Sequence, residues 1–296
     1  MWKQYLLPNS VESALQNMID PKGSLAIIAG GTDLLIDLRQ GRHSTVDKLI
    51  DITNIPEMSE ICLSNSRIFI GAAVSLADLI QNNLLNENAH CLIESCGLIG
   101  GPQVRNVATI GGNVAHALPA GDGIISLITL NAEVEIASIN GRRWQSLEEI
   151  FVSPGEISLN RDREIIVGFR IPIRKSGEGS AFKRVMRPQG VAIAILNMAI
   201  WIRIEEKQLI QNIRISIGPA GPRPFRARQT ESFIIGKQLS EIDFQQVAGV
   251  LEKEVKIRTS PHRATAEYRD HLLPILFQQV YESAINQSHR ILRENT

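Results

Sequence analysis

A change of pattern near residue 177 constrains the fold of this 296-residue chain more than any other feature. It lies within a polar, glycine-containing stretch at residues 174–180, which predicts a domain boundary. Beyond the boundary the hydrophobic pattern predicts three successive strands, at residues 181–185, 192–204 and 209–217. Helices are then expected near residues 226–235, 240–255 and 265–286, with Pro274 kinking or splitting the last one. Because neighbouring strands connect most simply as an antiparallel meander, residues 177–296 are expected to form an α+β domain.

The first 176 residues mix short apolar runs with glycine-rich turns. Strands are expected at residues 25–29, 46–52, 67–71, 133–138 and 164–172. Short helices are expected after Ser75, from residue 84 to 96, and from residue 146. Since strands and helices do not alternate as they would in a doubly wound sheet, this half is also predicted to be α+β. The predicted fold class is therefore α+β with two domains, at residues 1–176 and 177–296.

Charge and cysteine content narrow the possible functions. Lys plus Arg number 31 and Asp plus Glu number 31, so the formal net charge is zero. Proteins that bind nucleic acid normally carry a basic excess, and neither nucleic acid nor a membrane is expected as a partner. The chain lacks both the ~18 consecutive apolar residues of a spanning helix and a secretory signal, so a cytoplasmic location is expected. Three cysteines (Cys62, Cys91 and Cys96) are too few for a four-thiolate cluster, so we expect free thiols and no metal site.

Two glycine-rich segments carry the strongest chemical signal. The first is Ile27, Ile28, Ala29, Gly30, Gly31, Thr32, Asp33 and Leu34, and the second is Thr109, Ile110, Gly111, Gly112 and Asn113. Glycine lets the backbone approach a ligand, and successive N–H groups can line a concavity that binds phosphate oxygens. Two such cradles suit a long ligand with a diphosphate in its middle, such as FAD. The structural alternatives are a tight turn with Asp33 capping the next helix, and a hairpin turn or bulge at Gly-Gly-Asn.

Other signatures of nucleotide-binding and hydrolytic sites are absent. The sequence has neither G-x-G-x-x-G nor a Walker P-loop, and neither G-x-S-x-G nor H-E-x-x-H. His116 lies near the second segment and is expected to be a surface or packing residue. No catalytic residue is predicted.

Longer motifs accompany these two segments. They are Gly101-Pro102-Gln103-Val104-Arg105-Asn106, Ser180-Ala181-Phe182-Lys183 and Arg263-Ala264-Thr265-Ala266-Glu267-Tyr268-Arg269. Together the motifs resemble those of the FAD-binding medium subunits of molybdenum hydroxylases over nearly the whole chain. The resemblance is closest to the xanthine dehydrogenase FAD-binding subunit, with the medium subunits of carbon monoxide and nicotinate dehydrogenases as near relatives.

The resemblance implies a fold and a set of FAD contacts. The fold would be a PCMH/vanillyl-alcohol-oxidase-type FAD-binding domain, followed by a CO-dehydrogenase-flavoprotein C-terminal domain. The residues of both glycine segments would hold FAD, with Asp33 capping the loop rather than binding phosphate. Asp122 would bind sugar hydroxyls, which suit a carboxylate acceptor. Further contacts would come from Ile99 beside the flavin, Ile166 and Lys183.

The resemblance also implies a function and partners. The chain would be an electron-transfer subunit beside a molybdopterin-binding large subunit and a small subunit with two 2Fe–2S clusters. It would pass electrons from those clusters through FAD to NAD, since the cofactor carries the hard chemistry. The alternatives are the FAD subunit of a related CO, aldehyde or nicotinate dehydrogenase, a stand-alone flavin oxidoreductase, and a structural subunit that has lost flavin.

Overall fold

The computed structural model describes residues 2–19, 23–187, 193–205, 208–260 and 263–294, and the chain divides into two compact units. Unit 1 comprises Met1–Asn82, Gly100–Ala117 and Ala132–Pro172, and unit 2 comprises Asn83–Ile99, Leu118–Asn131 and Ile173–Thr296. Two segments from the first half of the sequence therefore belong to unit 2. The boundary at residue 176 remains a prediction for the two family domains.

Unit 1 begins with a small parallel sheet in the order β1-β3-β2. Its strands are β1 (Gln4–Leu6), β2 (Leu25–Ile28) and β3 (Lys48–Asp51), accompanied by helices α1 (Val11–Met18) and α2 (Leu34–Arg39). Helix α1 starts where Ser10 accepts a hydrogen bond from the Ser13 amide, and it buries an apolar stripe. Ile28 at the end of β2 packs in a local core with Val46 and Leu49.

The larger sheet of unit 1 is antiparallel, in the order β4-β5-β10-β6-β7. Its strands are β4 (Ile61–Ser64), β5 (Arg67–Gly71), β6 (Glu133–Ser138), β7 (Gly141–Ser146) and β10 (Glu164–Pro172). The register of β10 shifts between Ile166 and Gly168, so the strand predicted at residues 164–172 carries a bulge. The remaining elements are η1 (Pro56–Met58), α3 (Leu76–Gln81), α6 (Pro102–Arg105), α7 (Ile110–His116), η2 (Leu147–Ile150), β8 (Phe151–Ser153) and β9 (Glu156–Ile157).

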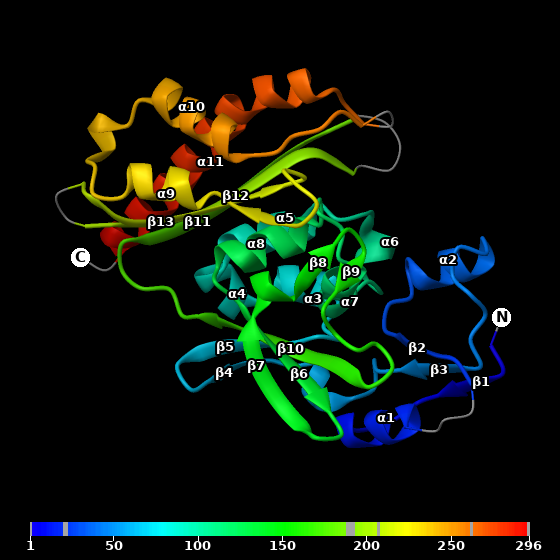
Figure 1. The fold of residues 1–296 in the computed structure, drawn as a ribbon. Coiled ribbons are helices and arrows are strands. Elements are labelled where there is room, and N and C mark those ends of the chain that lie inside the picture. Colours follow the sequence, from blue (N-terminus) through cyan, green and yellow to red (C-terminus); the bar gives the residue numbers. More distant parts are fainter. Residues whose placement is uncertain (1, 20–22, 188–192, 206–207, 261–262, 295–296) are drawn as a thin grey trace. The chain divides into compact units, whose positions relative to one another are not determined.

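Unit 2 is built on an antiparallel sheet with helices on both faces (Figure 1). The strands are β11 (Glu178–Met186), β12 (Ala194–Ile204), β13 (Ile210–Gly218) and the short β14 (Phe225–Arg226). One face carries α5 (His90–Gly97) and α8 (Asp122–Thr129), and the other carries α9 (Arg228–Ile234), α10 (Phe244–Glu254) and α11 (Ala266–Glu294). The elements α4 (Asn83–Asn88) and η3 (Leu239–Glu241) complete the unit. The three predicted strands and the α+β class are confirmed; residue 192, the expected start of the second strand, lies outside the described residues.

Several sequence expectations for the helices need correction. The helix expected at residues 84–96 is two helices, α4 and α5, separated by Ala89. Helix α11 is not split at Pro274 but continues through it, because its apolar residues, among them Leu273 and Phe277, are fully buried in the core of unit 2. Helix α8 was missed because all eight of its residues are buried, so it has no exposed face; its polar side chains, Asp122, Ser126 and Thr129, make hydrogen bonds inside the core. Cys91 and Cys96 are buried free thiols, as expected. No helix among the described residues is long and apolar enough to cross a membrane.

Candidate functional site

The first glycine segment forms the loop between β2 and α2 in unit 1. Gly31 has a φ of +65°, a left-handed conformation that side chains rarely adopt. A Cβ on Gly31 would also lie 2.9 Å from Ile28 Cδ1 and 3.1 Å from Leu35 Cδ1. Glycine is thus required here by the geometry of the loop itself.

The two glycine segments meet at Gly30. A Cβ on Gly30 would lie 2.1 Å from the carbonyl oxygen of Val107 and 2.7 Å from Ala108 Cα. These are backbone atoms of the residues directly before Thr109, so no side chain can move aside to make room. The two segments therefore meet within unit 1, and the absence of a side chain at Gly30 is what allows the contact.

The second segment is the first turn of helix α7, and neither a hairpin turn nor a bulge. Thr109 is the N-cap, and its hydroxyl accepts the Gly112 amide at 3.0 Å. The Ile110 amide donates to the Val74 carbonyl at 3.1 Å, and the Gly111 amide to the Ala72 carbonyl at 2.9 Å. The expectation of a second main-chain amide cradle is wrong at these positions, because the protein itself uses those three N–H groups.

Polar groups without a protein partner remain where the two glycine segments meet in unit 1. The amides of residues 30–34 have no hydrogen-bond acceptor among the described residues. The side-chain oxygen of Asn113 is buried and lacks a donor in the described part of the chain. Gly112 is exposed, and a Cβ there would meet only the Thr109 hydroxyl, at 3.1 Å. The unsatisfied Asn113 oxygen is unusual because it is buried, whereas the amides of residues 30–34 lie on partly exposed backbone at the start of α2, where free N–H groups can bind an anion.

Asp33 and His116 connect the loop to the end of α7. The His116 Nδ1 lies 3.3 Å from Asp33 Oδ2, which also accepts the Thr32 hydroxyl at 3.3 Å. Asp33 occupies the N-cap position of α2, but its side chain makes no capping hydrogen bond, so the expected capping role is wrong. The hydrogen bond to His116 holds the pKa of Asp33 below its usual range, and the same bond raises the pKa of His116. Sequence patterns contain no signal for a pair so far apart in the chain.

This pair predicts a pH-dependent contribution to stability. The raised pKa of His116 gives stability that is complete below its unfolded pKa of ~6.5 and is lost as the pH rises through the folded pKa. The lowered pKa of Asp33 gives stability present above ~3.9 and lost as the pH falls through its folded pKa. We expect the melting temperature of His116→Gln to fall below that of the wild type most between about pH 4 and 6.5, and the gap to narrow at higher pH. A gap that does not narrow as the pH rises above about 6.5 would contradict this role of the pair.

Ile166 of unit 1 and the predicted residues Ile99 and Lys183 of unit 2 each have their own local environment. Ile166 is buried in β10 and pairs with Ile136, as an ordinary core residue of the sheet does. Ile99 follows α5 in a turn in which its amide donates to the Cys96 carbonyl at 3.2 Å. By strand alternation, Lys183 shares the face of β11 that carries Ala181, a member of the core with α10 and α11. The FAD contacts of these residues remain predictions.

Asp122 lies at the start of α8 in a buried polar network. Its carboxylate accepts hydrogen bonds from Arg184, with which it forms an ion pair, and from Asn197 Nδ2 at 2.5 Å. Arg184 also donates to the Leu98 carbonyl at 2.6 Å, next to Ile99. Arg184 thus links Asp122 to the turn at Ile99, although sequence reasoning did not single it out. Both carboxylate oxygens of Asp122 are engaged, and each retains capacity to accept a further bond.

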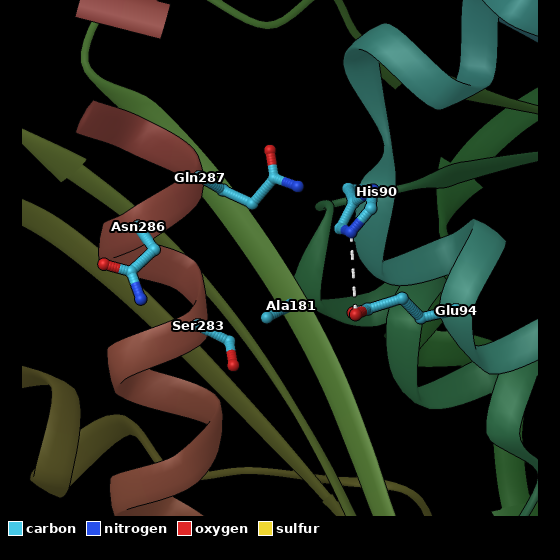
Figure 2. Close-up of a pocket in the computed structure, with 6 residues that line it drawn as sticks. All are labelled: His90, Glu94, Ala181, Ser283, Asn286 and Gln287. Carbon is cyan, nitrogen blue, oxygen red and sulfur yellow. Dashed lines mark ion pairs between the residues drawn. The ribbon is translucent and has the colours of Figure 1, made fainter. Parts of the chain in front are cut away.

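A separate pocket lies between α5, β11 and α11 in unit 2 (Figure 2). Its volume is about 270 Å³, and its lining residues are His90, Glu94, Ala181, Ser283, Asn286 and Gln287. His90 Nε2 lies 3.5 Å from Glu94, whose other oxygen accepts the Phe182 amide at 2.7 Å. None of the predicted FAD residues lines this pocket, and its volume is below the range of typical cofactor sites.

Comparison with known proteins gives matches along most of the chain. Residues 2–174 match the family model of the FAD binding domain in molybdopterin dehydrogenase, and residues 180–284 match the CO dehydrogenase flavoprotein C-terminal domain. The xanthine dehydrogenase FAD-binding subunit of Escherichia coli O157:H7 is 29% identical over 91% of both chains. The 6-hydroxypseudooxynicotine dehydrogenase complex subunit alpha of Paenarthrobacter nicotinovorans is 30% identical over 96% of this chain and 95% of that one. The fold matches a solved structure of carbon monoxide dehydrogenase from Hydrogenophaga pseudoflava with a TM-score of 0.89, at 26% identity, covering 97% of this chain and 98% of that chain.

Proposed function

Since the chain belongs to the family of FAD-binding subunits of molybdopterin dehydrogenases, we propose that it binds FAD at the two glycine segments and serves as an electron-transfer subunit. The fold and the family make it an oxidoreductase subunit with FAD as its cofactor. Bound FAD supplies hydride and single-electron transfer, while the protein positions it.

The residues at the two segments fit such a cofactor. The observation that carries the proposal is the contact of Gly30 with the backbone at Val107, because it places a row of unused amides beside the segment that leads into Asn113. The amides of residues 30–34 suit diphosphate oxygens, and the exposed Gly112 allows a close backbone approach. Asn113 can satisfy its unpaired oxygen with a donor of the cofactor, and its amide nitrogen can donate in turn.

We further propose that the chain works within a complex. Its relatives are named as subunits of xanthine dehydrogenase and of a 6-hydroxypseudooxynicotine dehydrogenase complex. The partners would be a molybdopterin-binding large subunit, where the organic substrate is oxidised, and a small subunit with two 2Fe–2S clusters. This chain would deliver the electrons to NAD. The exposed side chains of Val107, whose backbone contacts Gly30, and of Val104 would suit contact with such a partner.

Xanthine is the substrate that we propose for the complex, from the similarity to the xanthine dehydrogenase subunit. The intact complex, purified with its metal and cofactors, should reduce NAD with xanthine. Reduction with an aldehyde, nicotinate or a nicotine derivative instead would assign one of the related dehydrogenases. If this chain alone were yellow and were bleached by an organic substrate, it would be a self-contained flavin oxidoreductase.

The substitution Gly112→Ala tests the placement of FAD. In the free protein the added methyl group meets only the Thr109 hydroxyl, and alanine favours a helix by about 1 kcal/mol over glycine. We therefore expect the melting temperature of the FAD-free protein to hold or rise, while the affinity for FAD falls at least about tenfold, equal to ~1.4 kcal/mol. Titration followed by flavin fluorescence measures the affinity.

Gly249→Ala is the matched control, because Gly249 lies within α10 and a Cβ there has no neighbour within 4 Å. Gly249→Ala should stabilise its helix by about the same amount and should leave the affinity for FAD unchanged. Equal FAD affinity in both variants would place the cofactor elsewhere.

A further inference from the structure

Four arginines gather in unit 2, where three chain segments meet. Arg187 follows β11, Arg258 and Arg263 lie between α10 and α11, and Arg269 is in the first turns of α11. Arg187 donates to the Arg263 carbonyl at 3.0 Å, and Arg269 donates to the Arg258 carbonyl at 3.3 Å. Two of the four side chains are thus fixed by the backbone of the other two.

No carboxylate pairs with these arginines among the residues that the structure describes. The side chain of Arg269 is only 2% exposed, and its Nε lacks a partner in the described part of unit 2. Burial, and then the charges of Arg263 and Arg258, lower the pKa of Arg269. Burial also lowers the pKa of Arg263. A buried charge without a counter-charge is costly, so the cluster is incomplete as the chain stands.

We propose that Arg187, Arg258, Arg263 and Arg269 form a binding site for a phosphate group. Guanidinium groups hold phosphate oxygens through paired hydrogen bonds in a fixed geometry. The exposure of the arginines is graded, with Arg269 buried, Arg263 partly buried, and Arg187 and Arg258 exposed. Four positive charges match a doubly charged phosphate better than a single carboxylate. This site draws on other residues than the FAD contacts and does not depend on the proposed function.

Thermal unfolding of the full chain loaded with FAD tests the site. Inorganic phosphate, at about 100 times its Kd, should raise the melting temperature by about 3–8 °C relative to chloride at equal ionic strength. Malonate at the same ionic strength should give a much smaller rise, because it presents separate carboxylates. The phosphate group could belong to a phosphorylated small molecule or be the free anion, and glycerol 3-phosphate distinguishes the two. A larger rise in melting temperature than with inorganic phosphate indicates a phosphorylated ligand. A smaller rise indicates the free anion.

Two arginine variants and one control variant make the test specific. Arg263→Gln should lose most of the response to phosphate, whereas Lys253→Gln, an exposed residue of α10 with the same change of charge, should keep it. Arg269→Met should raise the melting temperature in chloride, because it removes an unpaired buried charge, and should also abolish the response. A phosphate response of wild-type size in both arginine variants, or an equal response to malonate, would overturn the proposal. Flavin absorbance should stay at the wild-type level in both variants, so failure of this site is distinguishable from failure of FAD binding.

Discussion

Gly30→Ala is expected to abolish FAD binding and to lower the stability of the protein. The added Cβ would lie 2.1 Å from the Val107 carbonyl oxygen and 2.7 Å from Ala108 Cα, so one backbone must move away from the other. Overpacking of this kind costs about 1–3 kcal/mol and can cost more where backbone has to shift. The β2–α2 loop would then no longer hold its free amides beside α7. Flavin content after purification and the melting temperature measure the two effects.

Gly41→Ala is the control for this prediction. Gly41 lies just after α2 with a φ of +68°, and a Cβ there has no neighbour within 4 Å. Its substitution costs only the strain of a left-handed alanine, about 1 kcal/mol, and leaves the loop contact intact. If Gly30→Ala kept full flavin and lost no more stability than Gly41→Ala, the contact of the two segments would have no role in binding.

Asn113→Leu should have opposite effects on the free protein and on the complex with FAD. Without FAD, the substitution removes a buried oxygen that has no donor and places a better helix former in α7, so the melting temperature should hold or rise. With FAD, a hydrogen bond is lost and its partner is left unsatisfied, which costs about 1–3 kcal/mol, or roughly 5- to 150-fold in affinity. Titration of the FAD-free protein with FAD gives the affinity.

The control for Asn113 is the exposed Asn212 of β13, in unit 2. Asn212→Leu should change neither the melting temperature nor the affinity for FAD by much, because surface substitutions usually have small effects. A destabilised FAD-free Asn113→Leu protein with unchanged affinity would show that Asn113 serves the fold and not the cofactor.

The sequence predicted the elements with clear periodicity and missed those without it. The strands of unit 2 were found because their apolar residues run continuously or alternate, and the helices near residues 226–286 because each has an apolar face. Helix α8 was missed because it is buried all round. Short edge strands such as β1 and β8 were missed because three residues are too few to show a period.

The sequence singled out two segments that meet in the structure, but not how their hydrogen-bonding groups are used. The paired glycines correctly marked two segments that meet, since only glycine permits the contact at Gly30. The use of the α7 amides by Ala72 and Val74 depends on residues more than 35 positions away, which no local pattern contains. The same is true of the ion pairs between Asp33 and His116 and between Asp122 and Arg184, since each joins residues that are far apart in the sequence.

The burial of α8 has a consequence for the synthesis of this protein. The ribosome releases this fully buried helix well before β12 and β13, the strands that cover it, have been translated. Until those strands emerge, the nascent chain exposes the apolar side chains between Ile124 and Ile128, and a holding chaperone can bind them. Slow elongation through the codons for residues 130–193 would lengthen that exposure and should favour aggregation during expression.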